Sequence, residues 1–175
     1  TIKDIIVLKP NAWACQAYDS ADGVIDGVKI ITSRPNGDGI SLQSCQNYEV
    51  KNCFVRSWDD SLVVKNYDQS SSDIQFSKIQ IWTDFAQSME VGYETNKGNQ
   101  PDSAITNVTF SEITVLNNFH KPVISVHNGD DASVEDITFC DITVEHEEIG
   151  SGDADEMAYL IDLNIMQSGN WSTTQ

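Results

Sequence analysis

The sequence predicts an all-β fold, a right-handed parallel β-helix in which short strands wind into stacked coils. Three observations support this prediction: a motif recurs at intervals of 25 to 34 residues, apolar and polar residues alternate within it, and no helical period is present. Repeats of this length bury their inward side chains only by stacking on their neighbours. The signature of leucine-rich repeats is absent, and a β-sandwich does not explain one motif recurring in register.

The first element of each repeat is a strand interrupted by a short bend. Five copies align on Ile30, Val55, Ile81, Val115 and Val144, at intervals of 25, 26, 34 and 29 residues. β-branched residues are abundant in these copies and every second residue is apolar, which is typical of strands with one buried face. The copies are residues 23–33, 47–57, 73–83, 107–117 and 136–146, with bends expected at 26–27, 51–52, 77–78, 111–112 and 140–141.

A second strand follows the first in each repeat. The chain also begins directly in an apolar, repeat-like run and ends without an amphipathic capping helix, although solenoids need capped ends. We therefore expect one domain of about six coils over residues 1–175, lacking one or both end caps and belonging to a longer protein. The second strands are expected at residues 39–45, 61–67, 88–94, 122–128 and 158–164, with a weaker copy at 14–20.

Composition restricts the possible partners. The formal net charge of −17 would repel nucleic acid and anionic membranes, and no apolar run is long enough to cross a bilayer. A neutral ligand fits this charge better. The four cysteines lack the C-x-x-C spacing of zinc sites, so we predict buried thiols and no metal site. The sequence does not specify an oligomeric state.

Three aspartates stand out by their position in the repeat. Asp38 lies two residues before Ile40, and Asp60 lies two residues before Leu62, so both occupy one column of consecutive coils. Because stacked strands lie roughly 4.8 Å apart, the two carboxylates are expected to be neighbours, with Asp59 beside them. Mutual repulsion then raises the pKa of at least one carboxyl group. Glycoside hydrolysis requires such a set, one carboxyl group protonated and another ionised.

A structural explanation of these aspartates remains open. Asp and Gly are common in turns, so Asp38-Gly39 can be a turn and Asp59-Asp60 a solvated loop. The pair Asp130-Asp131 shows how readily such sequences arise. It follows its strand instead of preceding it, so we expect a turn there.

The residues around the aspartates resemble two motifs of family 28 of the glycoside hydrolases, the polygalacturonases and their relatives. Residues 33–40, Ser-Arg-Pro-Asn-Gly-Asp-Gly-Ile, resemble the N-x-D-G motif, and residues 57–65, Ser-Trp-Asp-Asp-Ser-Leu-Val-Val-Lys, resemble the G-D-D motif. The resemblance implies that Asp59 is the general acid, that Asp38 and Asp60 hold the attacking water, and that the reaction inverts the anomeric centre. It also implies a secreted or extracellular protein, where extracellular includes a cell surface or a periplasm. The substrate would be a carbohydrate, and no cofactor would be needed.

The sequence departs from the polygalacturonase pattern after these motifs. Polygalacturonases carry a G-H-G motif and then an R-I-K motif, whose cations bind the galacturonate carboxylate. Residues 81–94 have no His, Arg or Lys, and they add Asp84, Glu90 and Glu94, which would repel an anionic polymer. The sequence is loosely similar to family 49, the dextranase and isopullulanase group, in the order of its motifs. The residues concerned are Asp59-Asp60, Lys65, Tyr67, Ile81-Trp82 and Met89 to Tyr93. We therefore expect a neutral α-glycan as substrate.

Further side chains near the motifs are candidates for substrate binding. Aromatic rings can stack on sugars, Lys65 ends the strand after the aspartate pair, and His120 heads the next coil's second strand. Packing between loops explains each aromatic ring equally well. The candidates are Trp58, Lys65, Tyr67, Trp82, Asp84, Glu94 and His120, and Tyr93 belongs to the same aromatic group.

Two other functions remain open. The first is a non-catalytic β-helix that binds glycans, which explains the repeats but not two motifs at family spacing. The second is a polygalacturonase-type pectin hydrolase, which the nearest family would suggest. A polysaccharide lyase would share the fold but needs basic groups that the candidate groove lacks.

Overall fold

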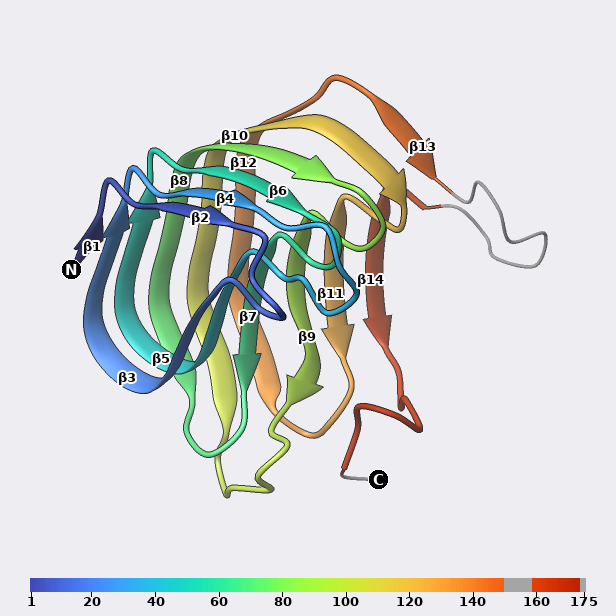
Figure 1. Ribbon diagram of the computed structural model, residues 1–175. Coiled ribbons are helices and arrows are strands. Elements are labelled where there is room, and N and C mark those ends of the chain that lie inside the picture. Colours follow the sequence, from blue (N-terminus) through green and yellow to red (C-terminus); the bar gives the residue numbers. More distant parts are fainter. Residues whose placement is uncertain (150–158, 174–175) are drawn as a thin grey trace.

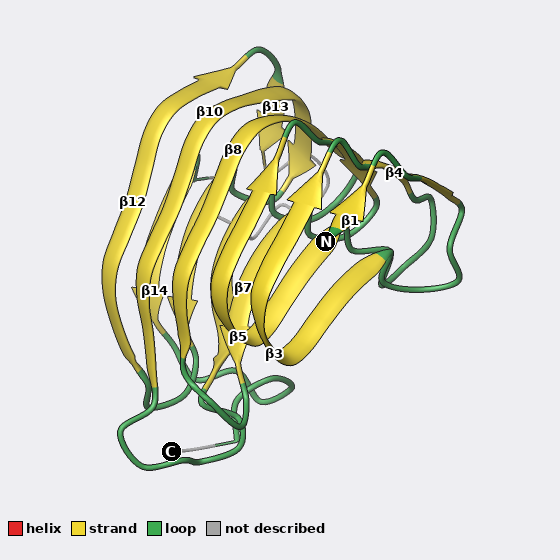
Figure 2. Ribbon diagram, turned by 90° about the vertical axis from the view of Figure 1, so that its left-hand side faces the viewer, coloured by secondary structure: helices red, strands yellow, loops and turns green. Residues whose placement is uncertain are grey.

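The computed structural model describes residues 1–149 and 159–173, and every regular element within them is a β-strand (Figure 1, Figure 2). All paired strands run parallel, and successive coils stack into a right-handed parallel β-helix, as the repeat predicted. No helix in this part of the chain could cross a membrane. The strands are β1 (Ile2–Lys3), β2 (Ile6–Leu8), β3 (Cys15–Asp26), β4 (Lys29–Ile31), β5 (Ile40–Lys51), β6 (Phe54–Ser57), β7 (Leu62–Asn66), β8 (Ser71–Thr83), β9 (Met89–Thr95), β10 (Ala104–His120), β11 (Ile124–Asn128), β12 (Ser133–Val144), β13 (Glu147–Ile149) and β14 (Ile161–Ile165).

Each coil has three faces. The groove face holds β7, β9, β11 and β14 with the first residues of β3 and β5, because Leu62 pairs with Ile40 on one side and with Met89 on the other. The middle face holds the later residues of β3 and β5 and the first halves of β8, β10 and β12. The third face holds β2, β4, β6 and the final residues of β8 and β10. The expected strand at 158–164 corresponds to β14, although Ala158 lies outside the described residues.

The predicted bends lie where the chain passes from the middle face to the third face. One residue of each has a left-handed backbone with a positive φ, a conformation that L-amino acids rarely adopt. These residues form a column through the coils, which turns each coil in the same place. The column consists of Gly27, Asn52, Lys78, Glu112 and Asp141.

A second column of left-handed residues runs through the middle face, and we call it the Asx column. It consists of Asp22, Asn47, Asp73, Asn107 and Asp136, with φ between 53° and 60°. Asp and Asn tolerate this conformation better than other residues with a side chain. The Asn47 amide donates to the Asp22 carboxylate at 2.6 Å, and the Asn107 amide donates to Asp73 at 2.7 Å.

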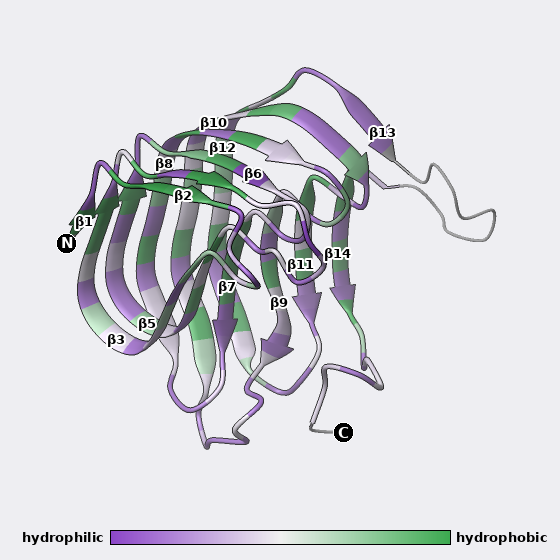
Figure 3. Cartoon of the chain, viewed as in Figure 1, coloured by the Kyte–Doolittle hydropathy of each residue, from purple (hydrophilic) through white to green (hydrophobic). Residues whose placement is uncertain are grey.

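The core is a set of inward-facing columns of apolar side chains. Figure 3 shows the alternation of hydrophobic and hydrophilic residues along the long strands. Phe76, Phe110 and Phe139 occupy equivalent positions in three coils, and their rings stack with centroids 4.8 and 4.9 Å apart. Apolar side chains in the outermost coils, such as Ile6 and Ile165, are exposed. Membership of a longer protein stays a prediction.

Candidate active site

The three aspartates lie in the turns between the third face and the groove face. Asp38 precedes β5, and Asp59 and Asp60 precede β7. The Gly39 amide donates to the Asp60 carbonyl at 2.8 Å, so Asp38 and Asp60 occupy equivalent positions in neighbouring coils, as their spacing predicted. A Cβ atom on Gly39 would lie 2.3 Å from the Ser61 carbonyl oxygen, which explains why this position requires glycine.

A buried row of polar side chains, most of them hydroxyl groups, holds the Asp60 turn from inside the β-helix. Ser61, directly after Asp60, lies 2.6 Å from the Ser57 hydroxyl and 2.9 Å from that of Thr83. Thr83 bonds Ser88 at 2.9 Å, and Ser88 donates to the Asn118 side chain at 2.6 Å. All five side chains belong to fully buried residues. Because buried polar groups without partners are costly, this satisfied network holds the backbone of the Asp60 turn in one position.

The two turns are also bonded to each other. The Thr32 hydroxyl donates to the Gly37 carbonyl at 2.6 Å and accepts a bond from the Trp58 amide at 2.9 Å. The backbone amide of Asn36 donates to the Asp59 carboxylate at 3.2 Å, and the Asp59 amide donates back to the Gly37 carbonyl at 3.3 Å. These contacts fix the position of Asp59 relative to Asp38.

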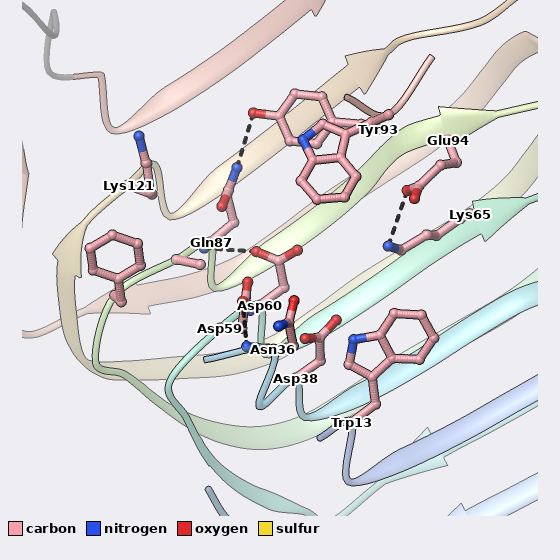
Figure 4. Close-up of a pocket in the computed structure, with 13 residues that line it drawn as sticks. Trp13, Asn36, Asp38, Asp59, Asp60, Lys65, Gln87, Tyr93, Glu94 and Lys121 are labelled. Carbon is pink, nitrogen blue, oxygen red and sulfur yellow. Dashed lines mark hydrogen bonds and ion pairs between the residues drawn. The ribbon is translucent and has the colours of Figure 1, made fainter. Parts of the chain in front are cut away.

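The aspartates open into a cavity of about 370 Å³ (Figure 4). Figure 4 shows Asp38, Asp59 and Asp60 close together, with the Lys65–Glu94 pair on one side and Gln87 and Tyr93 on another. The cavity is large enough for a small sugar unit. Its lining residues are Trp13, Asn36, Asp38, Asp59, Asp60, Lys65, Phe85, Ala86, Gln87, Tyr93, Glu94, Lys121 and Trp171.

Two of the carboxyl groups hold protons more strongly than ordinary aspartates. Burial, together with the charge of Asp59, raises the pKa of Asp38 to about 7. Burial raises the pKa of Asp60 well above its usual value, and the nearby charges of Glu90, Asp38 and Asp59 add to the effect. The Asp60 carboxylate accepts a hydrogen bond from the backbone N–H of Gln87 at 3.0 Å. The Asp38–Asp60 pair therefore retains a proton into the neutral range.

A buried ion pair lies beside the aspartates on the groove face. The Lys65 ammonium group lies 3.1 Å from the Glu94 carboxylate and 5.6 Å from the centre of the Trp13 ring. The other Glu94 oxygen accepts a bond from the Tyr67 hydroxyl at 3.0 Å and lies 3.8 Å from Lys97. Although burial lowers the pKa of Lys65, the charges of Glu94 and Asp60 raise it overall, so the ammonium group is charged at neutral pH.

A second charged cluster lies further along the groove face. His127 bonds the Glu90 carboxylate at 2.9 Å and the Asp162 carboxylate at 3.0 Å, and Ser125 also donates to Glu90. Burial lowers the pKa of His127, but its two carboxylate partners raise it to about 9, so the imidazole is protonated at neutral pH. The Tyr93 ring stacks on this imidazole with centroids 4.4 Å apart, which fixes one wall of the cavity.

The structure brings five of the ten predicted site residues into the cavity lining. These are Asp38, Asp59, Asp60, Lys65 and Glu94. Trp58, Tyr67 and His120 do not line the cavity but contact residues that do. Trp58 and His120 stack on the two sides of Phe85, and Tyr67 supports Glu94.

The structure does not bring Trp82 and Asp84, two of the predicted site residues, into the cavity lining. Trp82 lies on β8 next to Arg56 of β6, on the outer surface of the third face. Arg56 binds Asp84 through two hydrogen bonds of 3.0 and 3.1 Å and lies 5.3 Å from the Trp82 ring centre. The negative charge of Asp84 is therefore compensated by Arg56, which does not line the cavity.

Sequence reasoning also missed several lining residues. Trp13 and Trp171 come from opposite ends of the chain, and nothing in the repeat relates them. Gln87 could have been found, because it occupies in the next coil the column of Asp38 and Asp60. Nothing in the sequence indicates partners for His127, although it pairs with two carboxylates. No cluster of metal-binding side chains occurs in residues 1–149 and 159–173.

Three comparisons place these features among known proteins. Residues 1–153 match the model of the family described as "Glycosyl hydrolases family 28". A probable polygalacturonase from Vitis vinifera is 31% identical over 67 residues, which are 37% of this chain and 14% of that protein. A solved structure, the family 28 exopolygalacturonase of Yersinia enterocolitica, aligns at 14% identity with a TM-score of 0.39. That alignment covers 93% of this chain and 45% of the other, so the chain spans less than half the length of either relative.

Proposed function

The chain belongs to family 28 of the glycosyl hydrolases, and from this premise we propose that it hydrolyses glycosidic bonds of a poly- or oligosaccharide with inversion of the anomeric centre. The observation that supports this most is the meeting of three carboxylates from two neighbouring coils in one cavity, two of them at equivalent positions. The raised pKa values of Asp38 and Asp60 provide the mixture of protonated and ionised groups that the reaction needs. A secreted location follows from the same family resemblance.

In the proposed reaction, Asp59 donates its proton to the glycosidic oxygen as the bond to the anomeric carbon breaks. Asp38 and Asp60 hold a water molecule between them, and one of them, ionised, takes a proton from this water. The water oxygen forms the new bond on the opposite face of the sugar, which inverts the configuration. The leaving sugar departs as an alcohol, and the proton taken from water restores Asp59 through solvent.

The protonation pattern favours a second assignment of roles. Asp38 and Asp60 hold protons strongly, and Asp59 accepts two backbone N–H bonds, from Asn36 and Asp60. In this alternative Asp60 is the general acid and Asp59 belongs to the base. The two assignments predict opposite pH dependence. With Asp59 as acid, kcat/KM rises as the pH rises through about 7, because the Asp38–Asp60 pair must lose a proton.

We propose a neutral glycan as the substrate, as the acidic composition of residues 81–94 suggested. Lys65 and His127, two cations of the groove face, are already paired with carboxylates. A uronate polymer would meet an excess of negative charge in the cavity. The alternative is a polygalacturonase-type activity, which the names of the two relatives suggest.

The test compares the protein with Asp38→Asn, Asp59→Asn and Asp60→Asn on a panel of neutral glycans and on polygalacturonate, with the product anomer followed by NMR. We expect hydrolysis with inversion, and a loss of at least about 100-fold in each variant. The acid is the residue whose variant retains activity on a glycosyl fluoride of the same sugar, because fluoride leaves without protonation.

Each outcome of this test decides one part of the proposal. A retained anomer contradicts single displacement, and full activity in Asp59→Asn contradicts the role of that residue. Polygalacturonate as the best substrate would overturn the neutral glycan. Tight glycan binding without hydrolysis by the unmodified protein would instead support a binding module.

A further inference from the structure

The Lys65–Glu94 ion pair faces the cavity from the two strands that follow the aspartates. Lys65 is on β7 and Glu94 is on β9, in adjacent coils of the groove face, and both residues line the cavity. They are 7% and 5% exposed, so little water separates the charges. Figure 4 shows both side chains pointing toward each other beside Asp38 and Trp13.

Glu94 is held in this position from more than one side. One of its oxygens contacts the Lys65 ammonium group, and the other accepts a hydrogen bond from Tyr67 and lies near Lys97. Displacing Glu94 from Lys65 would deprive a buried carboxylate of its closest ion-pair partner, which is unfavourable. A ligand carboxylate would therefore have to displace a well-held internal one.

We propose that Glu94 is a specificity-determining residue, whose carboxylate occupies the place beside Lys65 that the carboxylate of a uronic acid would take, so that the cavity accepts neutral sugar units. The proposal rests on the proposed function only in taking this cavity as the sugar site. The positive charge of His127 is likewise compensated by the carboxylates of Glu90 and Asp162. Lys121 also lines the cavity and has interactions of its own within the protein.

The decisive variant is Glu94→Gln, which keeps the shape of the side chain but removes its charge. Lys65 can then pair with an anionic ligand. We expect the affinity for trigalacturonate, measured by titration calorimetry at low salt, to rise about tenfold or more, because an ammonium–carboxylate bond becomes available. The gain should decrease with added salt and disappear in the double variant Lys65→Gln/Glu94→Gln.

Two control variants separate this effect from other causes. Glu49→Gln removes one negative charge from an ion pair with Lys51 at 2.7 Å, on the middle face and outside the cavity lining. It should leave trigalacturonate affinity unchanged within about twofold, because a single solvent-exposed charge outside the cavity interacts only weakly with a bound ligand. Glu94→Asp keeps the negative charge and should give no gain. Circular dichroism checks that each variant is folded.

The unmodified protein offers a measurement that requires no variant. Galactotriose, the neutral analogue of trigalacturonate with the same linkage, should bind at least about tenfold more tightly than the acid. Equal or tighter binding of the acid would overturn the proposal, and so would a Glu94→Gln protein with no gain or a Glu49→Gln protein with the same gain. Because the titration measures binding, a gain in Glu94→Gln would stand even if no glycan were hydrolysed.

Discussion

Asp38 combines two properties that oppose each other in a folded protein. It is only 4% exposed, and burial with the charge of Asp59 raises its pKa to about 7. At neutral pH and above, folding therefore places an ionised carboxylate in a poorly solvated position. Such a residue reduces the stability of the fold and is retained where chemistry requires it.

We predict that Asp38→Asn stabilises the protein above pH 7. The folded pKa is raised above the unfolded value near 3.9, so the folded state binds more protons and stability falls as the pH rises from about 4 to 7. The uncharged variant avoids this loss and should gain about 1–3 kcal/mol at pH 8. A gain of 1 kcal/mol raises Tm by about 2–4 °C for this chain length. Thermal unfolding at pH 4 and pH 8 measures it, and an equal Tm difference at both pH values would show that the buried charge is not the cause.

The stacked turns and bends are the elements that set the register of the coils. In the Asx column, five consecutive coils place Asp or Asn at the same left-handed position. This conformation disfavours most side chains by about 1–2 kcal/mol, so the column selects Asp, Asn or Gly at each coil. The same register places Asp38 level with Asp60.

We predict that Asn47→Ala destabilises the protein by about 1–2 kcal/mol, because alanine is strained at a φ of 55° and cannot bond Asp22. Asn47→Gly loses the same hydrogen bond without the strain, so it should be less destabilised by about 0.5–1 kcal/mol. Urea unfolding of both variants measures the difference. An alanine variant as stable as the glycine variant would show that the backbone conformation is not the cause.

Much of the fold and part of the site could be predicted from the sequence. The repeat indicated the strands and bends, and the spacing of Asp38 and Asp60 placed them in one column. The repeat pattern could not show that Trp82 faces outward on the third face, because residues that are close in sequence can lie on different faces of a coil. The pairing of Lys65 with Glu94 joins residues from adjacent coils whose loops differ in length, and Trp171 comes from outside the repeat.

At the scale of the whole molecule, charge is the dominant feature. The chain carries 27 acidic and 10 basic side chains, and the resulting repulsion opposes the compact state. Few ion pairs of the described residues compensate, and several of them lie at the surface. Stability should therefore depend on the salt concentration.

We predict that Tm rises between 10 and 200 mM NaCl, because the screening length falls from about 30 Å to less than 10 Å over this range. Differential scanning fluorimetry at pH 8 measures the shift. Choline chloride at equal ionic strength is the control, since general screening does not depend on the cation. A Tm that stays constant or falls would contradict a destabilising role of the net charge.

The alternation within the Asx column has a consequence for building longer or shorter versions of this protein. Asp and Asn follow each other strictly from Asp22 to Asp136, and an amide donates to a carboxylate within the pairs Asn47–Asp22 and Asn107–Asp73. Duplicating one coil would stack two carboxylates or two amides. Duplicating two coils keeps donor next to acceptor. Coils should therefore be inserted or deleted in pairs, because only an even number keeps the alternation of Asp and Asn.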